Sequence, residues 1–169
     1  MRVLITAASR HGSTWDIARA IADALISEGI EVAVLPVNDV AEVTGFDAVI
    51  VGSAIYQGRW LAPARDLVAR FAADLTRRPV WLFSSGPLGW PPRSGQGPVD
   101  VDELIAVSGA FSHQVFGGCL DRTRLSLPER SMVAALRVRD RDDRDWSAIA
   151  DWSKSIAEHL RDLGETGAG

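Results

Sequence analysis

The sequence RVLITAASRHGST, residues 2–14, decides the fold of this chain. Residues 2–8 are a β-branched and apolar run that is typical of a buried strand. Residues 9–13 are turn formers, and apolar side chains then recur at helical spacing from Ile17 to Leu25. A strand, a short polar turn and an amphipathic helix in this order indicate a βα unit, the building block of a parallel sheet.

Two local signals predict the ends of this first helix. Ser13 and Asp16 have the spacing of a capping box, so we expect the helix to start there. Gly29 follows the last apolar turn, as a glycine at the C′ position does.

The same alternation continues along the chain and predicts the α/β class. Gly52-Ser53 is expected to end the third strand. Pro63 falls in the first turn of the second helix, where its missing N–H is harmless. The pattern predicts a doubly wound parallel sheet of five strands in the order 2-1-3-4-5. The expected strands are residues 2–8, 31–36, 48–51, 80–83 and 111–116, and the later helices are residues 61–75 and 146–163.

Composition narrows the class of protein. The 169 residues fit one domain, expected at residues 1–163 with a small polar tail at 164–169. The net charge is −4 and the arginines are spread along the chain, which does not favour a nucleic-acid partner. No apolar run is long enough to span a membrane and no signal peptide is visible. The single cysteine, Cys119, suits a reducing compartment, so we expect a cytoplasmic protein.

A doubly wound sheet binds its ligands beyond the carboxyl ends of the strands, next to the point where the strand order reverses. The loops after residues 8, 51 and 83 meet this description. The first loop joins a strand to a helix N-terminus, where free N–H groups and the helix dipole attract an anion. Its hydroxyl donors and one glycine suit a single terminal phosphate, because it has neither Gly-Lys-Ser/Thr nor GxGxxG. A capped helix start with a polar turn is the alternative interpretation.

The second loop, residues 52–60, carries two aromatic side chains. Its small first residue permits the close approach of a planar ligand, and Tyr56 and Trp60 can stack on an aromatic ring. Tyr56 is the better candidate because Trp60 begins the next helix. Alternatively, both rings cover the edge of the sheet.

The third loop, residues 84–98, consists mostly of Gly, Pro and Ser. A loop of this length is usually functional or mobile. Backbone N–H groups of residues 84–86 can face the polar edge of a ring, and Trp90 can shield its other face. Disorder from Pro91 onward is the alternative.

Four motifs resemble the flavodoxin-domain family, which includes bacterial flavodoxins and the menaquinone-dependent protoporphyrinogen oxidase group. They are ASRHGST at residues 8–14, VGSAIYQGRW at 51–60, FGGCLD at 116–121 and RDWSAI at 144–149, and the resemblance covers about residues 2 to 162. It implies a flavodoxin-like three-layer sandwich with a five-stranded parallel sheet.

The resemblance also implies flavin mononucleotide (FMN) as the cofactor, held by the three loops. The implied phosphate ligands are Ser9, Arg10, His11, Gly12, Ser13 and Thr14. The residues implied to flank the isoalloxazine are Ser53, Ala54, Ile55, Tyr56, Ser85, Gly86, Pro87, Leu88 and Gly89.

The chain departs from both branches of the family. Electron-carrier flavodoxins resemble Thr-x-Thr-Gly-x-Thr in the first loop, and here His11 replaces the middle hydroxyl. The Arg10-His11 pair is more similar to the oxidase side of the family. The segment from Leu120 to Asp140, however, is short and lacks the long basic and apolar insertion expected of an enzyme at a membrane quinone pool.

These observations predict an FMN-binding redox protein that passes electrons to a redox partner protein or a small-molecule reductant or oxidant. The flavin supplies the chemistry, so no catalytic side chain is expected. Two alternatives stay open: a flavin-dependent dehydrogenase of the protoporphyrinogen oxidase type, and a flavin-free binding module. We expect His113 and His159 to be structural, and the acidic run at residues 140–145 to be a solvated loop.

Overall fold

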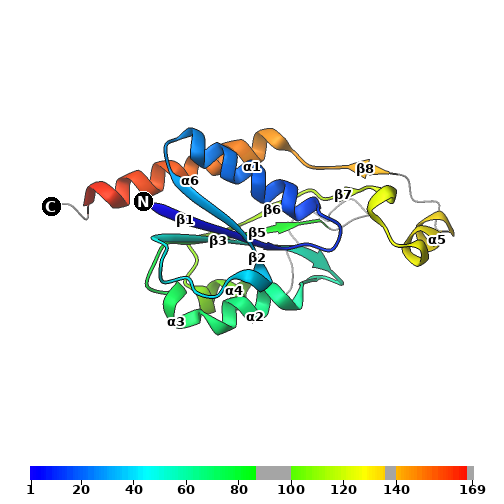
Figure 1. Cartoon of the computed structure of the whole chain (residues 1–169), viewed down its shortest axis with the longest axis horizontal. Helices are drawn as coiled ribbons and strands as arrows, with labels where there is room; N and C mark the ends of the chain where they lie inside the picture. Colours follow the sequence, from blue (N-terminus) through cyan, green and yellow to red (C-terminus); the bar gives the residue numbers. More distant parts are fainter. Residues whose placement is uncertain (87–99, 136–139, 167–169) are drawn as a thin grey trace.

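The computed structural model describes residues 1–86, 100–135 and 140–166. Five parallel strands form its central sheet in the order β2-β1-β3-β5-β6, which confirms the predicted order (Figure 1). A short sixth strand, β4, pairs antiparallel with β3. The strands are β1 (Arg2–Ala8), β2 (Glu31–Pro36), β3 (Ala48–Tyr56), β4 (Arg59–Trp60), β5 (Val80–Ser85) and β6 (Ser112–Phe116).

Helices cover both faces of the sheet, so the expected three-layer sandwich is confirmed (Figure 1). Alternate residues of β1 point to opposite layers: Val3 and Ile5 pack with α1 and α6, while Leu4 packs with α2 and α4. Burial on both faces explains why the strands are continuous apolar runs. One layer contains α1 (Ser13–Ser27) and α6 (Trp146–Thr166), and the other contains α2 (Ala62–Arg70), α3 (Ala72–Leu75), α4 (Val101–Ser108) and the 3₁₀ turn η1 (Val37–Asp39).

A separate segment lies beyond the carboxyl ends of the strands, at the right of Figure 1. We call it the arm. Its two short strands pair antiparallel with each other and stand outside the main sheet. Its elements are β7 (Cys119–Leu120), η2 (Arg122–Arg124), α5 (Leu127–Ala135) and β8 (Arg141–Asp142).

The two signals for the ends of α1 had different outcomes. Gly29 follows the helix with a φ of 81° and donates its N–H to Ile26, as predicted. The capping box is wrong: Gly12, at a φ of 86°, precedes the helix, and no side chain caps it. Ser13 and Asp16 instead bond to the arm and to Arg144, and these contacts replace a local cap.

The ends of the last helix and the second helix also differ from expectation. Helix α6 continues to Thr166, three residues into the expected polar tail, and residues 167–169 lie outside the described part of the chain. The expected helix at residues 61–75 is divided at Phe71 into α2 and α3. No helix in the described residues is long and apolar enough to cross a membrane.

Strand β3 runs through the residues expected to end it. It continues to Tyr56 and turns back at Gln57-Gly58, whose φ values of 51° and 75° are those of a two-residue type I′ hairpin. Gly52 therefore lies inside the strand, where a Cβ would overlap the ring of Phe83. The small side chain accommodates a core aromatic ring, and the predicted approach of a planar ligand at this position is wrong.

This packing predicts the effect of Gly52→Ala. The Phe83 ring is fully buried between Phe116 and Trp152 and cannot move aside, so the added methyl group overpacks the core. We expect a loss of about 1–3 kcal/mol in the free energy of unfolding, measured by urea denaturation. Gly45→Ala is the matched control, because a Cβ there meets only Glu42 Oε1 at 3.8 Å. Equal stability of the two variants would contradict the close packing of Gly52 against the ring of Phe83.

Candidate functional site

The first loop places three hydroxyl groups around the N-terminus of α1. Ser9 Oγ accepts the N–H of Gly12 at 3.0 Å, and Ser13 Oγ accepts the N–H of Cys119 at 3.1 Å. Because each serine oxygen acts as an acceptor in these bonds, its own proton remains to be donated. The first N–H groups of an α-helix also have no acceptor within the helix. The loop thus retains several donors for an anion.

Thr14 supplies the most informative of these hydroxyls. Its side chain is fully buried, and among the described residues its Oγ1 has no hydrogen-bond partner. A buried hydroxyl without a partner destabilises the fold by about 1–3 kcal/mol. A phosphate oxygen bound at the start of α1 would accept this hydrogen bond and remove the cost. The residues present therefore fit a phosphate group.

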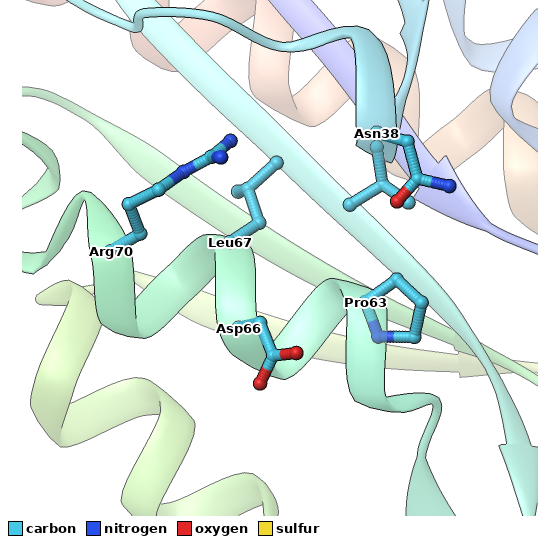
Figure 2. Close-up of a pocket in the computed structure, with 6 residues that line it drawn as sticks. Asn38, Pro63, Asp66, Leu67 and Arg70 are labelled. Carbon is cyan, nitrogen blue, oxygen red and sulfur yellow. The ribbon is translucent and has the colours of Figure 1, made fainter.

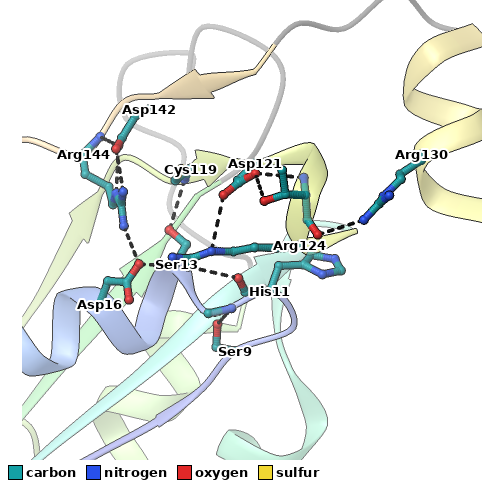
Figure 3. A network of polar contacts seen from close by, with 12 residues as sticks. Ser9, His11, Ser13, Asp16, Cys119, Asp121, Arg124, Arg130, Asp142 and Arg144 are labelled. Atoms are coloured by element: carbon teal, nitrogen blue, oxygen red, sulfur yellow. Dashed lines mark hydrogen bonds and ion pairs between the residues drawn. The ribbon is translucent and has the colours of Figure 1, made fainter. Parts of the chain in front are cut away.

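An ionic network surrounds the same helix end (Figure 3). Asp16 Oδ2 lies 3.0 Å from Nη1 of Arg124 and 2.9 Å from Nη1 of Arg144. Arg144 also bonds to Asp142, and this hydrogen bond lowers the pKa of the Asp142 carboxyl. The side chain of Arg144 is only 10% exposed, whereas its partners Asp16 and Asp142 are 29% and 46% exposed, so its ion pairs are partly shielded from solvent.

The aspartates at residues 140–145 are exposed, as expected, but the segment is more than a free loop because it pairs with the rest of the arm. Residues 141 and 142 form β8, and a Cβ on Gly117 would overlap the backbone of Asp143. The sequence analysis missed this network because Asp16 pairs with residues 108 and 128 positions away. Alternating Arg and Asp in the run RDRDDRD was the only local signal.

Arg10 and His11 contact protein groups on neighbouring segments. The guanidinium of Arg10 lies over the ring of Tyr56, 4.5 Å from its centroid, and so joins the first loop to the β3–β4 hairpin. His11 Nε2 lies 3.3 Å from Glu129 Oε1 on α5. The implied role of both side chains as phosphate ligands stays a prediction.

The second loop presents one aromatic side chain to solvent and buries the other. Tyr56 is 51% exposed, whereas Trp60 is 2% exposed. Trp60 donates its Nε1–H to Ser84 Oγ at 2.7 Å, so its predicted stacking on a ligand is wrong. Ser53 is buried too, donating to the carbonyl of Ala54 and accepting from the N–H of Leu61.

A buried polar cluster connects the second loop to both ends of the third. Ser84 Oγ also lies 2.7 Å from Nε2 of His113, and the carboxylate of Asp100 accepts the backbone N–H of Trp60. Burial lowers the pKa of His113 to about 4, against a smaller opposing effect of Asp100. His113 is thus a neutral structural residue, as expected.

The described residues at the start of the third loop belong to β5 or bond to β6. Ser85 is buried, and the N–H of Gly86 donates to the carbonyl of Phe116 at 3.1 Å, so this N–H is already paired within the sheet. The implied role of Ser85 and Gly86 beside the isoalloxazine stays a prediction. Pro87, Leu88 and Gly89, with Trp90 and Pro91, lie outside the described residues.

A groove of about 270 Å³ lies between η1 and α2 (Figure 2). None of the residues that line it belongs to the three loops. Its one cationic side chain, Arg70, already donates to the carbonyl of Val40. The groove is therefore separate from the candidate phosphate site. Its lining residues are Val37, Asn38, Pro63, Asp66, Leu67 and Arg70.

Comparison with sequence families matches residues 4–147 to the family described as a flavodoxin domain. The chain belongs to the flavodoxin-domain family. No curated protein sequence matches it significantly.

Several solved flavodoxins share the fold at low sequence identity. A flavodoxin from the domain Archaea has 20% identity and a TM-score of 0.67, with 95% of this chain and 99% of that chain covered. Oxidised flavodoxin 1 of Bacillus cereus has 17% identity and a TM-score of 0.65, with 94% and 99% covered. The flavodoxin of Streptococcus pneumonia TIGR4 has 20% identity and a TM-score of 0.60, with 96% and 99% covered. The likeness supports the fold of this flavodoxin-domain protein across nearly its whole length.

The pKa of His113 predicts a pH-dependent stability for this flavodoxin-domain protein. Its folded-state pKa of about 4 lies below the ordinary value of 6.5, so between these pH values the unfolded chain binds more protons. Stability therefore falls as pH decreases from about 6.5 towards 4. After allowance for solvent screening at this partly exposed ring, we expect a contribution of about 1–2 kcal/mol.

His113→Gln isolates this effect, because glutamine does not titrate. Urea denaturation at several pH values should show the wild type losing its stability advantage over the variant as the pH falls through this window. Parallel stability curves for the two proteins would show that His113 is not the group responsible.

Proposed function

We propose that this protein binds FMN and acts as a redox protein, with the flavin phosphate at the N-terminus of α1. The observation that carries the proposal is Thr14 Oγ1, a buried hydroxyl in the first helical turn with no partner among the described residues. Membership of the flavodoxin-domain family supports it. The neighbouring donors have the right chemistry for a terminal phosphate.

The residues of the first loop each have a distinct task in this proposal. Ser9 and Ser13 are oriented by the N–H groups of Gly12 and Cys119, which leaves their hydroxyl protons for phosphate oxygens. Thr14 gives a third hydroxyl, and the first-turn N–H groups add backbone donors. Gly12 adopts a left-handed backbone conformation that lets the chain turn from β1 into α1.

Tyr56 is the proposed aromatic contact for the isoalloxazine. It is half-exposed at the end of β3, where the fold places ligands. Its ring is fixed on the hairpin and by Arg10. FMN, when bound, supplies the electron-accepting and electron-donating chemistry. The protein residues bind and orient it, and the proposed redox partner is a protein or a small molecule.

Thr14→Val tests the phosphate site. The valine has nearly the same shape but no hydroxyl, so it removes one hydrogen bond to a charged group, worth roughly 1.5–3 kcal/mol. We expect FMN affinity to fall about tenfold or more and riboflavin affinity to stay unchanged, both measured by quenching of flavin fluorescence. The unliganded variant should be at least as stable as the wild type, because a buried unpaired hydroxyl has been removed.

Thr6→Val is the matched control for this experiment. Thr6 is also fully buried with an unpartnered hydroxyl, but it lies inside β1, so its replacement should leave FMN affinity unchanged. If the wild type binds FMN and riboflavin equally well, the phosphate site is wrong. If it binds neither, the flavin-free binding module replaces the proposal.

Tyr56→Leu tests the aromatic contact. The electron-rich face of a stacked ring disfavours the added electron density of reduced flavin. We therefore expect the variant to lose more affinity for oxidised than for reduced FMN, and its midpoint potential to rise. Tyr56→Phe keeps the ring and should preserve the potential. An unchanged midpoint potential in the leucine variant would show that Tyr56 does not contact the isoalloxazine.

A further inference from the structure

We propose that Arg124, which the arm carries and none of the three loops contains, supplies the positive charge that selects a phosphorylated flavin. This assignment rests on the proposed function and adds a ligand to the same site. A phosphate monoester carries about 1.5 to 2 negative charges at pH 7. The hydroxyl and N–H donors of the first loop are neutral, so they leave that charge without a counterion.

The guanidinium of Arg124 lies directly against the first loop (Figure 3). Its Nη1 is 3.4 Å from the carbonyl oxygen of His11, and a Cβ added to Gly12 would come within 2.9 Å of the same atom. Both positions precede the first turn of α1. Arg124 is thus brought to the N-terminus of this helix from a segment more than a hundred residues away in sequence.

The guanidinium has a donor left for a further ligand. Within the described part of the chain, its contacts use Nη1, towards His11 and Asp16, and Nε, which is 3.5 Å from Asp121 Oδ2. Nη2 takes part in none of them. A planar guanidinium with a spare N–H group is well suited to a phosphate oxygen.

The other cations near the loop make different contacts. Arg10 lies over the ring of Tyr56, and the imidazole of His11 faces Glu129. Arg144 binds Asp142 as well as Asp16, and its side chain is nearly buried. Arg124 is 44% exposed. Of the two arginines that pair with Asp16, Arg124 is the more exposed and also contacts the backbone of the first loop, so it is the better placed of the two to reach a bound anion.

Asp16 explains why such a cation is needed. Its carboxylate stands in the first turn of α1 and repels a phosphate at the same helix end. Arg124 and Arg144 both pair with Oδ2 of Asp16. When Arg124 donates a hydrogen bond to the phosphate, Arg144 therefore still neutralises the Asp16 carboxylate. The arrangement offsets the repulsion without leaving a charge unpaired.

The test compares Arg124 with Arg130, a second arginine of the arm. Arg130 donates from Nη2 to the carbonyl of Thr123 and from Nε to that of Leu125, so it holds the arm without contacting the first loop. Affinities for FMN and for riboflavin are measured by fluorescence quenching for the wild type, Arg124→Gln, Arg124→Lys and Arg130→Gln, at low and high salt.

We expect Arg124→Gln to weaken FMN binding at least about tenfold and to leave riboflavin binding within about twofold. Arg124→Lys should retain part of the selectivity. Arg130→Gln should retain all of it. The preference of the wild type for FMN should fall with salt, and that salt dependence should be smaller in Arg124→Gln.

Three results would overturn the assignment while FMN still binds to the wild type: unchanged FMN affinity in Arg124→Gln, equal losses for FMN and riboflavin, or the same loss of selectivity in Arg130→Gln. The last two would mean that Arg124 only holds the arm in place. Failure of the wild type to bind FMN would instead overturn the proposed function, and this assignment with it.

Discussion

The ion pairs of Asp16 with Arg124 and Arg144 hold the candidate phosphate site together. They bring the start of α1, the arm and the segment before α6 to one point beyond the carboxyl end of β1. Exposed ion pairs of this kind usually contribute less than about 1 kcal/mol each. Here Arg144 is nearly buried and binds two carboxylates, so removing Asp16 would leave a shielded cation with one partner fewer.

A set of buried hydrogen bonds holds the second and third loops. Trp60 on the hairpin, Ser84 at the end of β5 and His113 on β6 form a buried chain of hydrogen bonds. Asp100, at the start of α4, joins it through the backbone of Trp60. The polar groups satisfy one another inside the sheet–helix layer, so they stiffen the bases of the second and third loops. Tyr56 is left at the hairpin end, half-exposed.

The parts of the structure that sequence predicted are those set by local patterns. The two helix layers, Gly29 and Pro63 follow from apolar periodicity and backbone chemistry, which act within a few residues. The strand order was predicted from the topology common to doubly wound sheets. The strand end at Gly52 was wrong because its small size serves the distant ring of Phe83. The capping box failed for the same reason, since Asp16 has partners 108 and 128 residues away.

The candidate site shows the same division. The three hydroxyls of the first loop were predicted from a strand, a turn and a helix start, because a phosphate cradle is a local motif. Burial of Trp60 and the approach of Arg124 depend on how the sheet and the arm fold over that loop, and a single sequence contains no signal for either. The third loop was recognised by its composition, and its residues 87–99 lie outside the described part of the chain.

A crystal structure of the protein with FMN tests the central claim most directly. The account predicts a phosphate at the N-terminus of α1, with one oxygen within hydrogen-bonding distance of Thr14 Oγ1. A flavin whose phosphate lies elsewhere, with the Thr14 hydroxyl still lacking a partner, would contradict it.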